Sequence, residues 1–299
     1  LSLDGVGITQ TAAITQAANA GMVSFLGHAG ALVLTQANSL TGSVSLNSAA
    51  NAALTNSGTL SLALSSVGGN LTIVNNTGAI TEVGPVTVSG TSSFTTGSFG
   101  ITLEQDNLFT GAVSLVNAGA FDVSITNAKS LVLGTSTIGR NLTVNITGST
   151  ADETVTQTGV ITATGATTGL LITAGAAATT TSVNLSTQAN NFGSTAITFG
   201  GTGANFQDLA LRNTHASAAF PTLTGLSNLR HLTLIYDNAA IAFPALTLQS
   251  NGNLVVTAGG AISQTAALTI PGTASFTAGA NAIDLTDRGN SFSAAVSLK

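Results

Sequence analysis

The nine residues Asn38-Ser-Leu-Thr-Gly-Ser-Val-Ser-Leu46 recur almost unchanged as Asn107-Leu-Phe-Thr-Gly-Ala-Val-Ser-Leu115 and as Asn290-Ser-Phe-Ser-Ala-Ala-Val-Ser-Leu298. A fourth copy, Asn190-Asn-Phe-Gly-Ser-Thr-Ala-Ile-Thr-Phe199, is one residue longer. The asparagines that open the copies lie 69, 83 and 100 residues apart. A second landmark, a Gly-x-Ile-Thr-like segment, gives spacings of 72, 81 and 101 for Ile8, Ile80, Ile161 and Ile262. The chain is therefore built from four units that keep their order and grow in length.

Within each unit, apolar and polar residues alternate in triplets such as Leu60-Ser-Leu62, Leu71-Thr-Ile73 and Leu142-Thr-Val144. A period of two residues is typical of a β-strand with one apolar face. Turn residues separate the triplets, and apolar residues at helical spacing are absent. A coil that adds turns absorbs the lengthening of the units, whereas a closed barrel or sandwich does not. The sequence predicts an all-β fold, a right-handed parallel β-helix (β-solenoid) with about 20 residues per coil and about 15 coils.

We expect a single continuous β-solenoid over residues 1–299. Its units run approximately over 1–72, 73–153, 154–254 and an incomplete 255–299. Leu, Val, Ile and Phe should point inward, as Phe25, Phe94 and Phe276 at matching places indicate, and Thr, Ser and Asn should point outward. The structural markers of the repeat are Asn38, Asn107, Asn190, Asn290, Phe109, Phe192 and Phe292.

The stretch 205–236 departs from the pattern, because it carries much of the bulky polar content of the chain. Within it, Leu223, Leu226, Leu229 and Leu232 copy the spacing of a leucine-rich repeat once. We interpret the stretch as a longer irregular coil or a protruding loop. It holds the candidate interaction patch, which consists of Arg212, His215, Arg230, His231 and Tyr236.

The composition excludes several classes of protein. Only 6% of residues are charged, against about 25% in ordinary soluble domains, and the formal net charge is −5. Six basic residues scattered over the chain make no nucleic-acid footprint. Without Cys the chain has neither disulfides nor a Cys-ligated metal site, and His28, His215 and His231 stand singly. Apolar runs are too short for membrane insertion, and we expect no metal and no cofactor.

Catalysis is not expected either. The carboxylates nearest to one another in the sequence are Asp152-Glu153, Glu104 with Asp106, and Asp284 with Asp287, and we interpret the last two pairs as turn residues. Paired acids need a shared cleft, and the sequence supplies none, so we interpret the chain as no enzyme. Ice binding would need Thr-x-Thr at one fixed place on successive coils, and these triplets do not recur at coil spacing.

The four units, most clearly residues 260–298 (GAISQTAALTIPGTASFTAGANAIDLTDRGNSFSAAVSL), resemble the repeat regions of filamentous-haemagglutinin-like bacterial exoproteins. This resemblance implies a β-helical protein exported by a two-partner-secretion or autotransporter route. It implies an extracellular or cell-surface location and a role in adhesion, aggregation or biofilm.

An alternative is a structural subunit of an extracellular filament or sheath, assembled by end-to-end or lateral packing of rods. The last triplet, Val296-Ser-Leu298, carries no polar cap, so we expect self-association or continuation into further coils. The other expected partners are a host or neighbouring-cell surface and carbohydrate.

Overall fold

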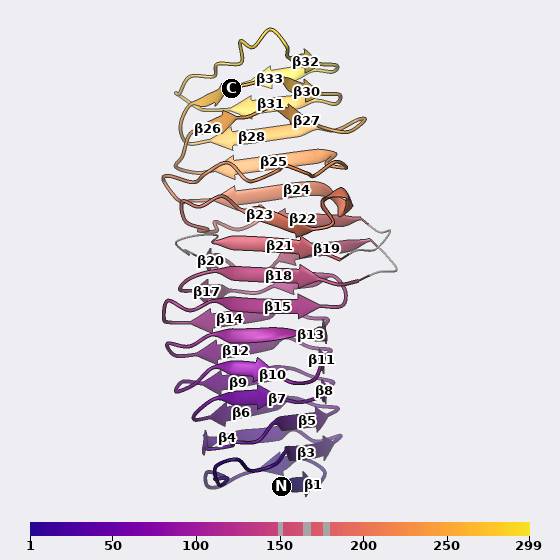
Figure 1. The fold of residues 1–299 in the computed structure, drawn as a ribbon, viewed down its shortest axis with the longest axis vertical. Helices are drawn as coiled ribbons and strands as arrows, with labels where there is room; N and C mark the ends of the chain where they lie inside the picture. Colours follow the sequence, from indigo (N-terminus) through magenta and orange to yellow (C-terminus); the bar gives the residue numbers. More distant parts are fainter. Residues whose placement is uncertain (149–151, 164–168, 176–179) are drawn as a thin grey trace.

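The computed structural model describes residues 1–148, 152–163, 169–175 and 180–299. The described chain forms a rod of stacked parallel strands, with the two termini at opposite ends (Figure 1). Two long sheets run along the rod, and the strands of one sheet point opposite to those of the other (Figure 1). Each turn of the solenoid contributes to both sheets over most of the rod.

The first sheet, called sheet 1, contains β1 (Ser2–Asp4), β3 (Val23–His28), β5 (Val44–Ser48), β7 (Leu60–Leu62), β8 (Ser65–Val67), β10 (Ile80–Glu82), β11 (Val86–Val88), β13 (Ile101–Phe109), β15 (Val123–Asn127), β18 (Leu142–Ile146), β21 (Leu170–Ala174) and β23 (Thr198–Gly201).

The second sheet, called sheet 2, contains β2 (Ile8–Thr9), β4 (Leu32–Asn38), β6 (Ala52–Asn56), β9 (Leu71–Asn75), β12 (Ser92–Thr96), β14 (Val113–Asn117), β16 (Leu131–Leu133), β17 (Ser136–Ile138), β19 (Glu153–Gln157), β20 (Ile161–Ala163), β22 (Thr181–Leu185), β24 (Phe206–Asn213), β25 (His231–Tyr236), β28 (Leu254–Ala258), β31 (Ala274–Thr277) and β33 (Val296–Leu298).

Beyond sheet 1, towards the C-terminus, two small sheets pair β26 (Ile241–Phe243) with β29 (Ile262–Gln264), and β27 (Leu246–Thr247) with β30 (Leu268–Ile270) and β32 (Ser291–Phe292). The single helix in the described part of the chain is the 3₁₀ turn η1 (Gly203–Asn205). In that part, no helix is long and apolar enough to cross a membrane.

The predicted β-solenoid is confirmed, with about 14 turns where the sequence suggested 15. Register partners of the paired strands in sheet 2 lie from 18 residues apart, for Asn38 and Asn56, to 28 apart, for Glu153 and Thr181. Within each sheet of the described part of the chain the paired strands are parallel, as a coil that advances in one direction requires.

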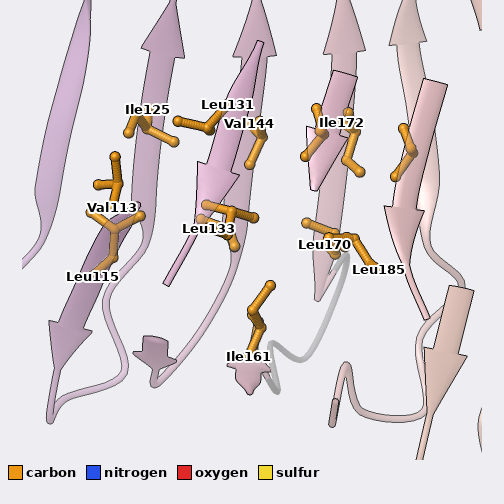
Figure 2. Packing of buried hydrophobic residues seen from close by; sticks show 14 of the residues in the cluster. Val113, Leu115, Ile125, Leu131, Leu133, Val144, Ile161, Leu170, Ile172 and Leu185 are labelled. Carbon is orange, nitrogen blue, oxygen red and sulfur yellow. The ribbon is translucent and has the colours of Figure 1, made fainter. Parts of the chain in front are cut away.

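The core fills the space between the two sheets. Burial alternates along each strand, as in Val113–Asn117, where Val113 and Leu115 are fully buried and Ser114 lies outward. Figure 2 shows the side chains from successive turns meeting in this space: Val113, Leu115, Ile125, Leu131, Leu133, Val144, Ile161, Leu170, Ile172 and Leu185. The predicted inward phenylalanines are buried, and Phe94 meets Phe109 edge to face at 5.7 Å between ring centroids. Phe292 of the last turns is partly buried.

Two expectations about polar and irregular parts are corrected. Asparagine does not simply point outward: Asn38, Asn107 and Asn190 are fully buried at the corners between sheets. The irregular segment is also shorter than 205–236, because β24 and β25 are regular strands of sheet 2. Only residues 214–230 leave the strand pattern, in turns that touch sheet 1 through a bridge from Thr222 to Thr198.

Candidate interaction surface

The asparagine markers occupy equivalent corners of the solenoid. In three of the four units the asparagine pairs with a glutamine, and the two side-chain amides exchange hydrogen bonds: Asn38 with Gln10, Asn190 with Gln157, and Asn290 with Gln264. In the second unit Asn107 pairs with Glu82 instead. The asparagine markers therefore stabilise the coil from inside, because their side chains form hydrogen bonds with backbone groups where the strands turn.

The Asn190 corner shows what such a pair does. Asn190 Nδ2 donates to Gln157 Oε1 at 2.8 Å and to the Leu185 carbonyl at 2.9 Å. Its Oδ1 accepts from Gln157 Nε2 and from the Ile161 backbone N–H, both at 2.9 Å. All four bonds are buried, so each replaces a hydrogen bond to water that the corner cannot reach.

The glutamine partners were missed in the sequence, although a signal was present. They stand at the third place of Ile8-Thr-Gln10, Val155-Thr-Gln157 and Ile262-Ser-Gln264, and the second unit has Ile80-Thr-Glu82. The landmark taken at Ile161 is therefore six residues late, because Val155 is the equivalent of Ile8. The Ile161 N–H instead bonds to the asparagine, as the N–H groups of Ile14, Val86 and Leu268 do in the other units.

The cationic members of the predicted patch are engaged in ion pairs on the outer face of sheet 2. Arg212 Nη2 lies 2.9 Å from Asp237 Oδ2, and Arg230 Nη2 lies 2.8 Å from Asp208 Oδ2. Both pairs join the neighbouring turns that carry β24 and β25. The bond to Asp208 raises the pKa of Arg230. The two arginines therefore fasten adjacent turns to each other on a partly exposed face.

The other members of the patch are dispersed. His231 Nδ1 accepts the Asn253 backbone N–H at 3.0 Å, and His215 Nδ1 accepts that of Ser217 at 3.1 Å. Tyr236 is buried, donates its hydroxyl to the Ala219 carbonyl at 2.6 Å, and has its pKa raised by burial. Tyr236 therefore belongs to the core and not to an accessible patch, because its side chain continues the inward row of Leu232 and Leu234.

The carboxylates named in the sequence bond mainly to hydroxyl groups of other turns. Glu104 Oε1 accepts from Ser124 at 2.7 Å, Asp106 from Thr147 at 2.9 Å, and Glu153 from Ser130 at 2.8 Å. Asp152 accepts from the hydroxyl and backbone N–H of Thr180, which lower its pKa. Asp284 and Asp287 accept from Thr286 and from the Gly289 N–H within their own turn. The part of the chain that the structure describes holds no group of three His, Asp or Glu able to bind a metal.

A groove of about 500 Å³ crosses the outer face of sheet 1. It runs over β13, β15, β18, β21 and β23 and is lined by Glu104, Ser124, Ile125, Thr126, Thr143, Asn145, Thr173, Ala174 and Gly201. Thr173 donates to Asn145 Oδ1 at 2.8 Å, and Asn145 Nδ2 donates to Thr126 at 3.5 Å, so these side chains are linked from turn to turn. The groove is deeper at one end, because Gly200 and Gly201 pair with Thr173 and Ala174 and have no side chains to fill the space. We call it the sheet 1 groove.

Two other hollows lie further along the rod. One of about 260 Å³ crosses the outer face of sheet 2 beside the ion pairs and is lined mainly by Thr154, Thr156, Ser182, Asn184, Asp208, Ala210, His231 and Thr233. The other, of about 670 Å³, lies between residues 220–229 and the segment 242–247 that carries β26 and β27. Phe220, Leu223 and Leu246 contribute apolar side chains to its lining, and the side chains that line the sheet 1 groove include hydroxyl and amide groups.

Comparison with known proteins supplies a family. The family model described as "Repeats of unknown function (DUF5649)" matches residues 49–116, 120–199 and 229–299, about three quarters of the chain. Each match contains one complete corner pair and ends nine residues after its asparagine, at Asn107, Asn190 and Asn290. The chain has no match among curated proteins or solved structures.

Proposed function

Because the chain belongs to the DUF5649 family of repeats of unknown function, we propose its role from its own surface: a non-enzymatic β-helical segment of a secreted or cell-surface bacterial protein that acts in adhesion, aggregation or the biofilm matrix. The resemblance to filamentous-haemagglutinin-like exoproteins supports this role and suggests export by a two-partner-secretion or autotransporter route. In this proposal the rod is a stiff spacer, and its outer faces make the contacts.

The observation that carries the proposal is the sheet 1 groove. Its Thr and Asn side chains are held by hydrogen bonds from one turn to the next, about 4.8 Å apart, so they are arranged before any ligand arrives. A pre-ordered row loses little side-chain entropy on binding. Hydroxyl and amide groups in a shallow open trough suit the hydroxyl groups of an extended carbohydrate chain. We therefore take surface carbohydrate as the ligand class.

Beads coated with the purified chain test this proposal when they are mixed with bacterial cells and with isolated surface polysaccharide. The variant Thr143→Arg places a long side chain in the groove, and Thr257→Arg places the same side chain on an outward threonine of β28 away from it. We expect the groove variant to lose binding and the control to keep it, with equal circular dichroism spectra. Unchanged binding in the groove variant, or no binding by the unmodified chain, would overturn the proposal.

A second candidate, the filament or sheath subunit, is favoured by apolar residues on the outer face of sheet 2. Val33 and Val255 are 40% and 42% exposed there, and a chain with only 6% charged residues opposes lateral packing little. Lateral packing predicts that the sedimentation coefficient rises with concentration and that Val255→Lys abolishes the rise. A sedimentation coefficient independent of concentration would exclude this alternative.

A further inference from the structure

One corner of the repeat differs in chemistry from the other three, because a carboxyl group stands there in place of a side-chain amide. In the three amide pairs, the glutamine Nε2 donates to the asparagine Oδ1 and also to the carbonyl two residues ahead, that of Ala12, Gly159 or Ala266. In the second unit Glu82 stands at this place. A carboxylate has no hydrogen to donate to either acceptor.

The bonds of Glu82 reproduce half of the amide pair. Its Oε1 accepts from Asn107 Nδ2 at 2.9 Å, as the glutamine Oε1 does elsewhere, and from the Gln105 backbone N–H at 2.5 Å. Its Oε2 is buried and has no hydrogen-bond partner. By the geometry of the other three corners, Oε2 takes the place of the donating Nε2. A proton on Oε2 would restore a donor, either to Asn107 Oδ1 or to the Gly84 carbonyl.

The charges around Glu82 favour that proton. The strands packed against β10 are β7 and β13, and β7 carries no ionisable side chain. β13 carries Glu104 and Asp106, and no basic residue lies on β7, β10, β11 or β13. Burial, with a smaller contribution from the charge of Glu104, raises the pKa of Glu82 from 4.5 to about 7, against the opposing effect of the bonds from Asn107 and Gln105.

We propose that Glu82 is a proton-operated latch of the solenoid, which closes the β10–β13 corner like an amide pair when protonated and loosens it when ionised. In the ionised state Glu82 Oε2 faces the side-chain oxygen Oδ1 of Asn107, and no hydrogen lies between the two acceptors. Asn107 Oδ1 also accepts the Val86 backbone N–H at 2.7 Å, so a displaced Asn107 weakens the start of β11 as well. The latch is a property of the rod and does not depend on the proposed adhesive role.

The direction of the pH effect follows from proton linkage. The folded chain binds the Glu82 proton more tightly than the unfolded chain does, because the pKa is raised on folding. This contribution to stability is fully present below about pH 4.5 and is lost as the pH rises through about 7. The shift corresponds to at most about a 300-fold change in proton affinity, and screening by solvent at this partly exposed site reduces the expected local effect to about tenfold.

Carbon-13 NMR of the full chain tests the latch, because the sequence contains only three glutamates, Glu82, Glu104 and Glu153. We expect one side-chain carboxyl resonance to titrate near pH 7 and to vanish in Glu82→Gln. Hydrogen exchange at the Val86 amide, corrected for intrinsic base catalysis, should accelerate about tenfold between pH 5 and 8 in the unmodified chain and stay constant in Glu82→Gln.

The variant Gln157→Glu is the matched gain-of-function test, since it places a carboxyl in a buried amide corner. We expect a fourth glutamate resonance with a raised pKa and a new pH dependence of exchange at the Ile161 amide, which bonds to Asn190. If all glutamates titrate below pH 5, the latch is refuted. Equal pH dependence of exchange at Val86 in the unmodified chain and Glu82→Gln would also refute it, whatever the titration.

Discussion

The corner pairs allow burial to be separated from hydrogen bonding within one molecule. Asn190 and Asn290 make the same four bonds, to a glutamine amide in both directions, to a leucine carbonyl and to a backbone N–H. Asn190 is fully buried, whereas Asn290 is partly exposed. Replacing each by alanine therefore removes equal bonds from unequal surroundings.

The expected magnitudes follow from the groups left behind. Asn190→Ala leaves the Ile161 N–H and the Leu185 carbonyl buried without a hydrogen-bond partner, and each lowers the free energy of unfolding by about 1–3 kcal/mol. The Gln157 amide also loses two hydrogen bonds. We expect a loss of about 3–5 kcal/mol at this corner. For Asn290→Ala, water replaces the lost partners, and we expect about 1 kcal/mol.

The assay is native-state hydrogen exchange, because a solenoid can open one turn at a time and a single melting curve would average over turns. The Ile161 amide in Asn190→Ala should exchange at least 100-fold faster than in the unmodified chain, and the Leu268 amide in Asn290→Ala about fivefold faster. Equal accelerations at the two corners would refute the reasoning, since they would mean that burial does not set the cost of an unsatisfied group here.

Three further predictions concern the stack and its outer faces. Val113→Asp should cost about 4 kcal/mol or more in the free energy of unfolding, by placing a charge in the core, while Ser114→Asp on the outward face should cost less than about 1 kcal/mol; urea unfolding measures both. Gly201→Ala should lower stability by about 1–3 kcal/mol, because Gly201 has φ +73° and a Cβ there would collide with a neighbouring carbonyl, whereas Gly21→Ala, with open space around it, should be neutral in the same measurement. Arg212→Ala should cost about 0.2–1 kcal/mol in low salt and nothing detectable in 1 M NaCl, because its ion pair is partly exposed; an equal loss in both salts would show that the side chain acts by packing.

The sequence predicts the strands of this fold well because their signal is local and repeated. A triplet such as Leu142-Thr-Val144 places its outer residues inward whichever turn it belongs to, and both are fully buried. The same rule extends through Leu232 and Leu234 to Tyr236, so the burial of that tyrosine was available from the pattern. The hypothesis of a surface patch included Tyr236 because the side chain is bulky and polar.

The corners were harder to predict, because an asparagine in a turn and an asparagine buried at a corner look alike in a sequence. Asn190 differs from an ordinary turn residue only through Gln157, which lies 33 residues earlier and has no local relation to it. The ion partners of Arg212 and Arg230 lie 25 and 22 residues away, one turn of the solenoid, which is a distance that only the register of the coil identifies. Contacts between turns therefore become predictable once the length of each turn is known.

The corner, and not the length, defines the unit of this chain. The distance from the glutamine or glutamate to its asparagine is 28, 25, 33 and 26 residues in the four units. Each time the asparagine Nδ2 still donates to the glutamine or glutamate Oε1, and the asparagine Oδ1 still accepts a backbone N–H. The length of a turn can change, as it does between 19 residues for Ala52 and Leu71 and 28 for Glu153 and Thr181, without altering the parallel pairing of the strands. A corner has less freedom, since its backbone N–H and the two side chains must stay within hydrogen-bond distance of one another. A change of chemistry at a corner, such as Glu82 in place of glutamine, therefore affects the strands on both sides of that corner. The same side chain on an outer face would be solvated.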